Sequence, residues 1–282
     1  MTLPDDGPSP SARPVPSLPG RAAITRTQGV NPFDVTAEEG EHYDAVRPSY
    51  PSAAVDWVLA DLGAPLDVVD LGAGTGLFTR LLAARPADQV RFVAAVEPSE
   101  SMRAVLARDV ADPSGRVSAL PGTAEASGLA EASADVVVAA QAWHWVDVPA
   151  ASAESARVLR PGGRLAAVWN QLDTTVPWVH RLTRIMHAGD VHAAAPEQRR
   201  FAAPFGPEEH ERWSWSMQLR PAQLHGLMAS RSYWLRAGRP TRERMIANLD
   251  WYLHEHLGHA EDEVLTVPYL TVAWRARRPR RR

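Results

Sequence analysis

The segment QAWHWVD, residues 141–147, places one histidine between two tryptophans. His144 could move a proton, because the unperturbed pKa of histidine, about 6.5, lies near neutral pH. The flanking rings of Trp143 and Trp145 could instead line an apolar pocket, with the imidazole as one more part of its wall. The segment is compatible with both roles, and we expect the pocket-lining role.

A glycine-rich stretch, VVDLGAGTG (68–76), has the residue types of a nucleotide-binding turn. Glycine lets the backbone bend sharply and lets a ligand approach without a Cβ atom in the way. A dinucleotide-binding turn would need a third glycine at position 77, which is leucine, and a P-loop would need a lysine, which the chain lacks. Glu97 follows the next apolar run, where a carboxylate can accept hydrogen bonds from both ribose hydroxyls. The spacing therefore predicts a nucleoside ligand without a pyrophosphate group.

Strands and helices alternate along the part of the chain that would position these residues. Short apolar runs predict strands, and 3.6-residue spacing predicts helices between them. The predicted strands cover 67–72, 91–98, 116–120, 135–141, 164–170, 210–219 and 264–277. The predicted helices cover 55–62, 77–84, 99–109 (with Ser99 as its cap), 150–159, 221–231 and 239–256. The alternation predicts an α/β fold with a doubly wound, mostly parallel sheet, and such sheets bind ligands at the carboxyl ends of their strands.

Five stretches in order resemble the motifs of the class I S-adenosylmethionine-dependent methyltransferases. They are VVDLGAGTG (68–76), AAVEPS (94–99), GTAE (122–125), DVVVAAQAWHW (135–145) and RVLRPGGRL (157–165). Together with YDAVRPSYP (43–51), the pattern is most similar to a small-molecule branch that includes trans-aconitate methyltransferase-like enzymes. The resemblance implies a Rossmann-like fold with a seven-stranded sheet, S-adenosylmethionine as cofactor, and a helical cap over the acceptor site.

The resemblance also assigns roles to individual residues. Asp70 would order the glycine loop and the amino group of the cofactor, and Glu97 would hold the ribose. Met102 would press on the adenine, and Gln141 would lie beside the methionyl chain. The full set of expected cofactor contacts is Tyr43, Arg47, Asp70, Gly72, Ala73, Gly74, Glu97, Pro98, Met102, Thr123, Ala124, Glu125, Gln141 and Ala142. The expected acceptor pocket consists of Trp143, His144, Trp145, Trp169 and Asn170, with His144 as the one candidate catalytic residue.

Tyr43 and Arg47 lie four residues apart, and hence on one face if a helix ends before Pro48. An arginine there can bind a carboxylate through two parallel hydrogen bonds. We therefore expect Arg47 to contact the carboxylate of the cofactor.

Composition excludes several other chemistries. Among 282 residues there is no cysteine and no lysine, which removes thiolate nucleophiles, disulfides and lysine Schiff bases. The net charge of −3 gives no electrostatic case for nucleic acid or an anionic membrane as partner. The cluster HEHLGH (254–259) looks like a metal site, but in an α-helix His254 and His256 would point about 200° apart. We therefore expect no metal.

The chain ends differ in composition from the middle. Residues 1–30 are proline-rich and acidic at the start, which predicts a disordered leader and no signal peptide. The terminal RARRPRRR (275–282) could tether nucleic acid, but we expect a solvated terminus. The methyltransferase domain would then span 31–282, with cap elements at 31–55 and 171–208. Frequent Ala, Arg and Pro suggest a bacterial protein, expected in the cytoplasm.

The expected reaction is methylation of a small-molecule acceptor, such as a bacterial secondary metabolite or a small acid. A carboxylate acceptor needs no base, whereas a phenol, alcohol or amide can require one. Two alternatives remain at this stage: a non-methylation reaction on the same fold, such as a cyclisation, and a cofactor-binding protein without chemistry.

Overall fold

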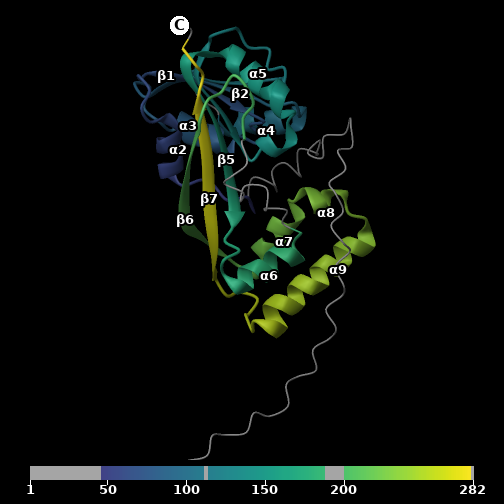
Figure 1. Ribbon diagram of the computed structural model, residues 1–282. Helices are drawn as coiled ribbons and strands as arrows, with labels where there is room; N and C mark the ends of the chain where they lie inside the picture. Colours follow the sequence, from purple (N-terminus) through teal and green to yellow (C-terminus); the bar gives the residue numbers. More distant parts are fainter. Residues whose placement is uncertain (1–45, 111–113, 188–199, 281–282) are drawn as a thin grey trace, which may run out of the picture. The chain divides into compact units, whose positions relative to one another are not determined.

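The computed structural model describes residues 46–110, 114–187 and 200–280. Seven strands in these residues form one sheet, in the order β3-β2-β1-β4-β5-β7-β6 (Figure 1). Their bounds are β1 Leu66–Leu71, β2 Val90–Val96, β3 Val117–Leu120, β4 Ala134–Ala140, β5 Leu159–Leu172, β6 Glu208–Leu219 and β7 Leu265–Arg277. The first five strands are parallel, and β7 runs antiparallel to both β5 and β6. The predicted doubly wound, mostly parallel sheet is confirmed.

Helices cover both faces of the parallel part of the sheet (Figure 1). Helices α2 (Ser52–Leu59) and α3 (Leu77–Ala83) pack on one face, where Val68 and Val136 belong to their core. Helix α5 (Val148–Val158) packs on the other face, against Val69 and Val137. Because neighbouring residues of one strand are buried on opposite faces, these strands are apolar without alternation.

Helix α4 (Glu100–Asp109) begins as the sequence predicts. The Ser99 side chain accepts a hydrogen bond from the backbone N–H of Met102 at 3.5 Å, which caps the first turn.

A second group of helices follows the parallel strands and was only partly predicted. It comprises α6 (Pro177–Ile185), α7 (Pro221–Ala229), α8 (Ser232–Arg236) and α9 (Arg239–Asp250). Leu182, Leu224 and Leu249 share a core with Leu172 and Tyr269 at the ends of β5 and β7. In Figure 1 these helices lie around and below the tip of the β5 arrow, next to the lower part of β7, with which they share a core. They therefore lie on the side of the carboxyl ends of the parallel strands.

The expected cap segment 171–208 contains only α6 of this helical group, since α7, α8 and α9 come later in the chain. Parts of the expected cap, 31–45 and 188–199, lie outside the described residues, as does the expected leader 1–30. In the described part of the chain, no helix is both long and apolar enough to span a bilayer.

The predicted helix 239–256 is α-helical only as far as Asp250 and ends in a π-helical turn. Helix α9 stops at Asp250, and Trp251–His256 form a π-helical turn, η3, in which the N–H of Leu257 donates to the carbonyl of Tyr252 at 3.0 Å. The ring of His256 stacks on Tyr252, and Nδ1 of His254 lies 2.7 Å from the carbonyl of His259. No group of three possible metal ligands occurs within the described ranges.

The expectation of a solvated terminus over 275–282 is wrong for Arg275 and Ala276, which are buried, whereas Arg277 is exposed. Strand β7 continues to Arg277, and Arg275 is only 9% exposed. The Arg275 guanidinium donates to the carbonyl of Trp57 at 2.5 Å, and that of Arg277 donates to the carbonyl of Asp61 at 2.8 Å. These arginines satisfy backbone carbonyls at the end of α2 and in the turn after it.

Candidate functional site

The glycine loop between β1 and α3 adopts a backbone that side chains rarely allow. The φ angles of Gly72, Gly74 and Gly76 are 65°, 58° and 91°. A Cβ atom at Gly72 would lie 2.6 Å from Cβ of Ala142, whereas one at Gly74 would meet only Sδ of Met102, at 3.9 Å. Gly72 is thus required by a close contact within the protein, and Gly74 leaves room beside Met102.

Glu97 lies directly against this loop. The backbone N–H groups of Gly72 and Ala73 donate to the carbonyl of Val96, at 2.8 and 3.1 Å. The Glu97 carboxylate accepts from the N–H of Gly74 at 3.0 Å and from the N–H of Ser99 at 2.8 Å. Burial raises the pKa of Glu97, and these two hydrogen bonds act in the opposite direction. The carboxyl end of β2 therefore carries an acid that touches the loop following β1, and its contact with a ribose stays a prediction.

Asp70 holds the second carboxylate of the site and is fully buried. Its Oδ2 accepts a hydrogen bond from the hydroxyl of Thr79 at 2.7 Å. Its Oδ1 is also buried, and no donor among the described residues reaches it. Burial raises the pKa of Asp70 to about 7, and the negative charge of Glu97 adds to that shift. A cation placed beside Oδ1 would satisfy this oxygen and favour the ionised carboxylate.

The loop after β3 lies beside the same edge, since the N–H of Glu97 donates to the carbonyl of Leu120 at 3.1 Å. Thr123 and Ala126 exchange backbone hydrogen bonds of 3.1 and 3.3 Å, which closes a tight turn. The carboxylate of Glu125 accepts from the N–H of Asp147 at 2.7 Å. The Glu125 hydrogen bond thus links the predicted adenine-binding segment to Asp147, the residue that caps α5.

Two further predicted contacts, Pro98 and Met102, lie on the same side of the sheet. The carbonyl of Pro98 accepts from the Arg103 guanidinium at 2.7 Å, and Met102 is 4% exposed. Asp70, the glycine loop, Glu97, Met102 and the turn after β3 thus occupy the carboxyl edge formed by β1, β2 and β3.

The next strand end carries the segment 141–147. Gln141 has a φ of 56°, a left-handed conformation that is uncommon for a residue with a side chain. Its backbone N–H donates to the carbonyl of Val168 at 2.8 Å, and its side chain donates to the carbonyl of Asn170 at 2.5 Å. The bend places Ala142 against Gly72, so this segment begins in contact with the glycine loop.

Trp143, His144 and Trp145 form a short 3₁₀ turn, η1, and have different surroundings. Trp143 is 3% exposed, donates from Nε1 to the carbonyl of Arg200 at 2.8 Å, and packs edge-on against Phe201. Trp145 is 37% exposed, and its ring centroid lies 5.0 Å from that of His144. Trp143 therefore belongs to the core, while His144 and Trp145 reach the surface.

His144 accepts a hydrogen bond from Trp169 at the end of β5. The indole Nε1 of Trp169 lies 3.3 Å from Nδ1 of His144. An indole N–H can only donate, so Nδ1 must be unprotonated and the proton of the neutral ring must be on Nε2. Proton uptake at Nδ1 would break this bond. The arrangement makes His144 a hydrogen-bond donor through Nε2, which supports the expected non-basic role.

Asn170 and Arg47, both predicted site residues, contact other parts of the chain. The Asn170 amide donates to the carbonyl of Ser49 at 2.9 Å, and its oxygen accepts from the hydroxyl of Thr271 at 2.6 Å. The Arg47 guanidinium donates to the carbonyl of Ser230 at 2.8 Å. Asn170 thus fastens the segment before α2 to β7. The contact of Arg47 with a cofactor carboxylate stays a prediction, and Tyr43 lies outside the described residues.

Comparison with known proteins fits this geometry. Residues 69–167 match a family model described as a methyltransferase domain. An uncharacterized methyltransferase of Mycobacterium tuberculosis is 39% identical over 235 residues, which span 83% of this chain and 91% of that protein. The chain belongs to the class I S-adenosylmethionine-dependent methyltransferases.

Two further proteins are similar to this chain over most of their length. A methyltransferase-like protein of Schizosaccharomyces pombe is 32% identical and spans 74% of this chain and 81% of its own. The solved structure of a putative type II methyltransferase from Anaeromyxobacter dehalogenans superposes with a TM-score of 0.62 at 29% identity, covering 83% of this chain and 99% of that one. The fold of the chain is thus similar to that of a solved methyltransferase structure.

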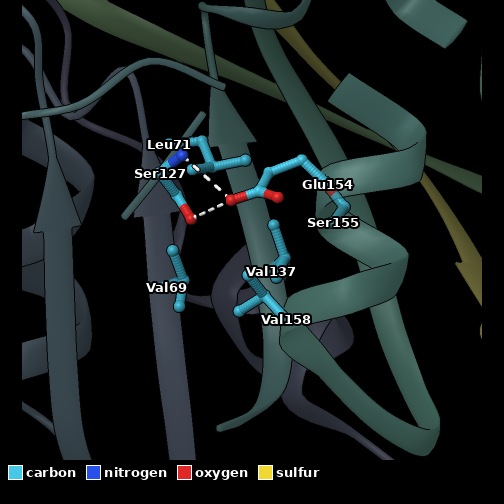
Figure 2. Close-up of a pocket in the computed structure, with 7 residues that line it drawn as sticks. All are labelled: Val69, Leu71, Ser127, Val137, Glu154, Ser155 and Val158. Atoms are coloured by element: carbon cyan, nitrogen blue, oxygen red, sulfur yellow. Dashed lines mark hydrogen bonds between the residues drawn. The ribbon is translucent and has the colours of Figure 1, made fainter. Parts of the chain in front are cut away.

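Sequence reasoning missed Thr79, which is fully buried on the methyltransferase's helix α3. A threonine among the apolar residues of LFTRLLA was the available signal. It also missed Ser127 and Glu154, which line a small void between α5 and the valines of β1 and β4 (Figure 2). This void is too small to admit a water molecule and is not a ligand site.

Proposed function

We propose that this protein transfers the methyl group of S-adenosylmethionine to a small-molecule acceptor. The observation that carries the proposal is Oδ1 of Asp70, which is buried beside the glycine loop with no donor from the described residues. The methionine part of the cofactor has an ammonium group, which is the kind of cation that such an oxygen requires.

The residues of the carboxyl edge fit the rest of the cofactor. Asp70 and the backbone of Gly72 and Gly74 would hold the methionine part, and Glu97 would accept hydrogen bonds from the ribose. Met102 and the turn Thr123–Glu125 would enclose the adenine. When bound, S-adenosylmethionine supplies an electrophilic methyl group on a sulfonium sulfur.

The proposed acceptor is a small carboxylic acid, in keeping with the resemblance to trans-aconitate methyltransferase-like enzymes. A carboxylate is ionised at neutral pH and attacks without a base. One of its oxygens would form the bond to the methyl carbon as the carbon–sulfur bond breaks, with the electron pair going to sulfur. The Nε2–H of His144 suits such an acceptor, because it can donate to a carboxylate oxygen, and the Trp169 indole keeps Nδ1 from acting as the base.

The proposal extends to the acceptor and to the location of the protein. The acceptor would be a bacterial secondary metabolite or a related small acid, and the protein would act in the cytoplasm. It would bind neither nucleic acid nor a membrane, which the net charge of −3 supports.

Turnover with a panel of small di- and tricarboxylic acids, trans-aconitate included, tests the reaction. We expect a methyl ester and S-adenosylhomocysteine to form in equal amounts with at least one acid. A product that forms without S-adenosylhomocysteine would favour a cyclisation. If phenols or amines are methylated and no acid is, the carboxylate proposal is wrong while methyl transfer stands.

A further inference from the structure

Helix α5 carries a carboxylate that holds the loop after β3 in place (Figure 2). One oxygen of Glu154 accepts two hydrogen bonds from Ser127, from its backbone N–H at 2.9 Å and from its hydroxyl at 2.5 Å. Ser127 is 2% exposed, and the apolar side chains around this contact are Val69, Leu71, Val137 and Val158. No water fits into the remaining space. The bond between loop and helix is therefore direct and shielded.

Arg157, one turn further along α5, completes the connection. Its guanidinium donates twice to Glu154, each time at 2.7 Å, and also to the carbonyl of Leu129 at 2.6 Å. These hydrogen bonds from Arg157, assisted by those from Ser127, lower the pKa of Glu154 to about 2. Glu154 is thus ionised at every pH at which the enzyme would be assayed, and it fixes both Ser127 and Arg157.

The loop between β3 and Ser127 has little freedom of its own. A Cβ atom at Gly122 would lie 2.9 Å from both the carbonyl oxygen of Ser127 and a methyl group of Val96. The turn Thr123–Ala126 is closed by backbone hydrogen bonds. A loop this tight moves as one piece, so the anchor at Ser127 sets where Ala124 and Glu125 lie relative to the end of β2.

We propose that Glu154, oriented by Arg157, is a positioning residue for the nucleoside base of the cofactor. It would hold Ala124 and Glu125 at the edge of the adenine, and so it would set the preference of the site for adenine over other purines. This inference rests on the proposed S-adenosylmethionine site.

Calorimetric titration with two probes tests the proposal. The first is S-adenosylhomocysteine, and the second is S-inosylhomocysteine, in which an oxygen replaces the amino group of adenine. The wild-type protein should prefer the adenine ligand. Glu154→Ala should lower the affinity for S-adenosylhomocysteine about tenfold, the scale of one hydrogen bond to a charged group, and should bring the ratio of the two affinities toward one.

Two milder variants distinguish a positioning role of Glu154 from a general loss of folding. Glu154→Gln keeps an oxygen that can accept from Ser127 and should retain most of the preference. Ser127→Ala loses the hydroxyl bond and should lower the preference less than Glu154→Ala does. If Glu154→Ala does not fold, these two variants carry the test.

Asp135→Ala is the matched control. The Asp135 carboxylate also accepts from a backbone N–H, that of Asp67 at 2.9 Å, and from an arginine, Arg160 at 2.7 Å, but it lies at the amino end of β4. Asp135→Ala should lower the thermal stability of the protein without changing the ratio of its affinities for S-adenosylhomocysteine and S-inosylhomocysteine. The proposal is overturned if the Glu154 and Ser127 variants keep the wild-type ratio, or if Asp135→Ala changes it as much. If the wild-type protein binds neither probe, the proposed cofactor site itself is wrong.

Discussion

At the scale of single residues, the two buried carboxylates of the cofactor edge have different partners. Both oxygens of Glu97 accept backbone hydrogen bonds, whereas Asp70 has one oxygen with no donor from the described residues. The sequence indicated both acids through their spacing from the glycines. The threonine in LFTRLLA could indicate a buried polar contact but not its partner Asp70, because this contact depends on how α3 turns back onto β1.

Asp70→Asn should change both stability and cofactor affinity. The pKa of Asp70 is raised from its ordinary value of 3.8 to about 7 in the folded protein, so between these two pH values the native state keeps a proton that the unfolded chain has lost. Without ligand, wild-type stability should therefore fall as pH rises from about 4 to 7, by as much as about 4 kcal/mol, and Asp70→Asn should flatten this fall. Urea denaturation at several pH values measures the effect.

The same ionisation predicts how ligand binding depends on pH. An ammonium group requires the charged Asp70, so the affinity for S-adenosylhomocysteine should rise as pH increases through about 7, and Asp70→Asn should lose that rise. Asp109→Asn, at an exposed carboxylate, should behave like the wild type in both experiments. A wild-type affinity that is constant from pH 6 to 8 would contradict the assigned role of Asp70.

The His144 variants separate a donor from a base. His144→Asn keeps an N–H donor and should retain kcat within about tenfold, whereas loss of a general base costs about 10²–10⁴. Trp169→Phe keeps an aromatic ring to pack against Trp274 but loses the N–H that fixes the tautomer, so the share of His144 rings with the proton on Nδ1, followed by nitrogen NMR, should rise. A drop in kcat above a hundredfold for His144→Asn, with KM and the circular dichroism spectrum unchanged, would show that His144 is the base.

At the scale of elements, apolar patterns predicted six of the seven strands to within two residues at each end, whereas β5 begins at Leu159, five residues before the predicted start at 164. Helix α6 was missed, although its buried residues Val179 and Leu182 lie three positions apart, a spacing that local patterns can detect. The π-helical turn at the end of α9 was also missed. Tertiary contacts fix its aromatic rings, such as the hydrogen bond from the Tyr252 hydroxyl to the carbonyl of Trp178. Such contacts cannot be predicted from the spacing of residues within the segment.

The contact between the glycine loop and the end of β4 yields a prediction about stability. Gly72→Ala adds a methyl group 2.6 Å from Ala142 at a positive φ, and should lower the free energy of unfolding by about 2–5 kcal/mol. In the double mutant Gly72→Ala/Ala142→Gly the clash is removed. The remaining loss of unfolding free energy should be that of the backbone strain at position 72, about 1–2 kcal/mol.

Gly128→Ala provides the control for this pair, because Gly128 also has a positive φ, 73°, but no atom lies within 4 Å of the added methyl group. Gly128→Ala should lower the free energy of unfolding only by the backbone strain. A double-mutant cycle by urea denaturation that shows no coupling between positions 72 and 142 would refute the contact.

At the scale of the whole molecule, the parallel order of β1 to β5 brings residues far apart in sequence to one edge. Asp70, Glu97 and the segment 141–147 lie at the carboxyl ends of three different parallel strands, β1, β2 and β4. The sequence predicted this edge because the parallel fold implies it. It did not predict the second core, in which Leu172, Leu224 and Leu249 meet, because those contacts join elements that no local pattern links.

We expect this edge to bind S-adenosylmethionine through Asp70, Glu97 and the glycine loop. Calorimetric titration of the full chain at pH 8 with S-adenosylhomocysteine, and separately with NAD, measures this binding. The expected result is one S-adenosylhomocysteine per chain, no binding of NAD, and a loss of about 1.5–3 kcal/mol in binding free energy for Glu97→Ala. Binding of NAD without binding of S-adenosylhomocysteine, or an unchanged affinity in Glu97→Ala, would show that this edge is not the cofactor site.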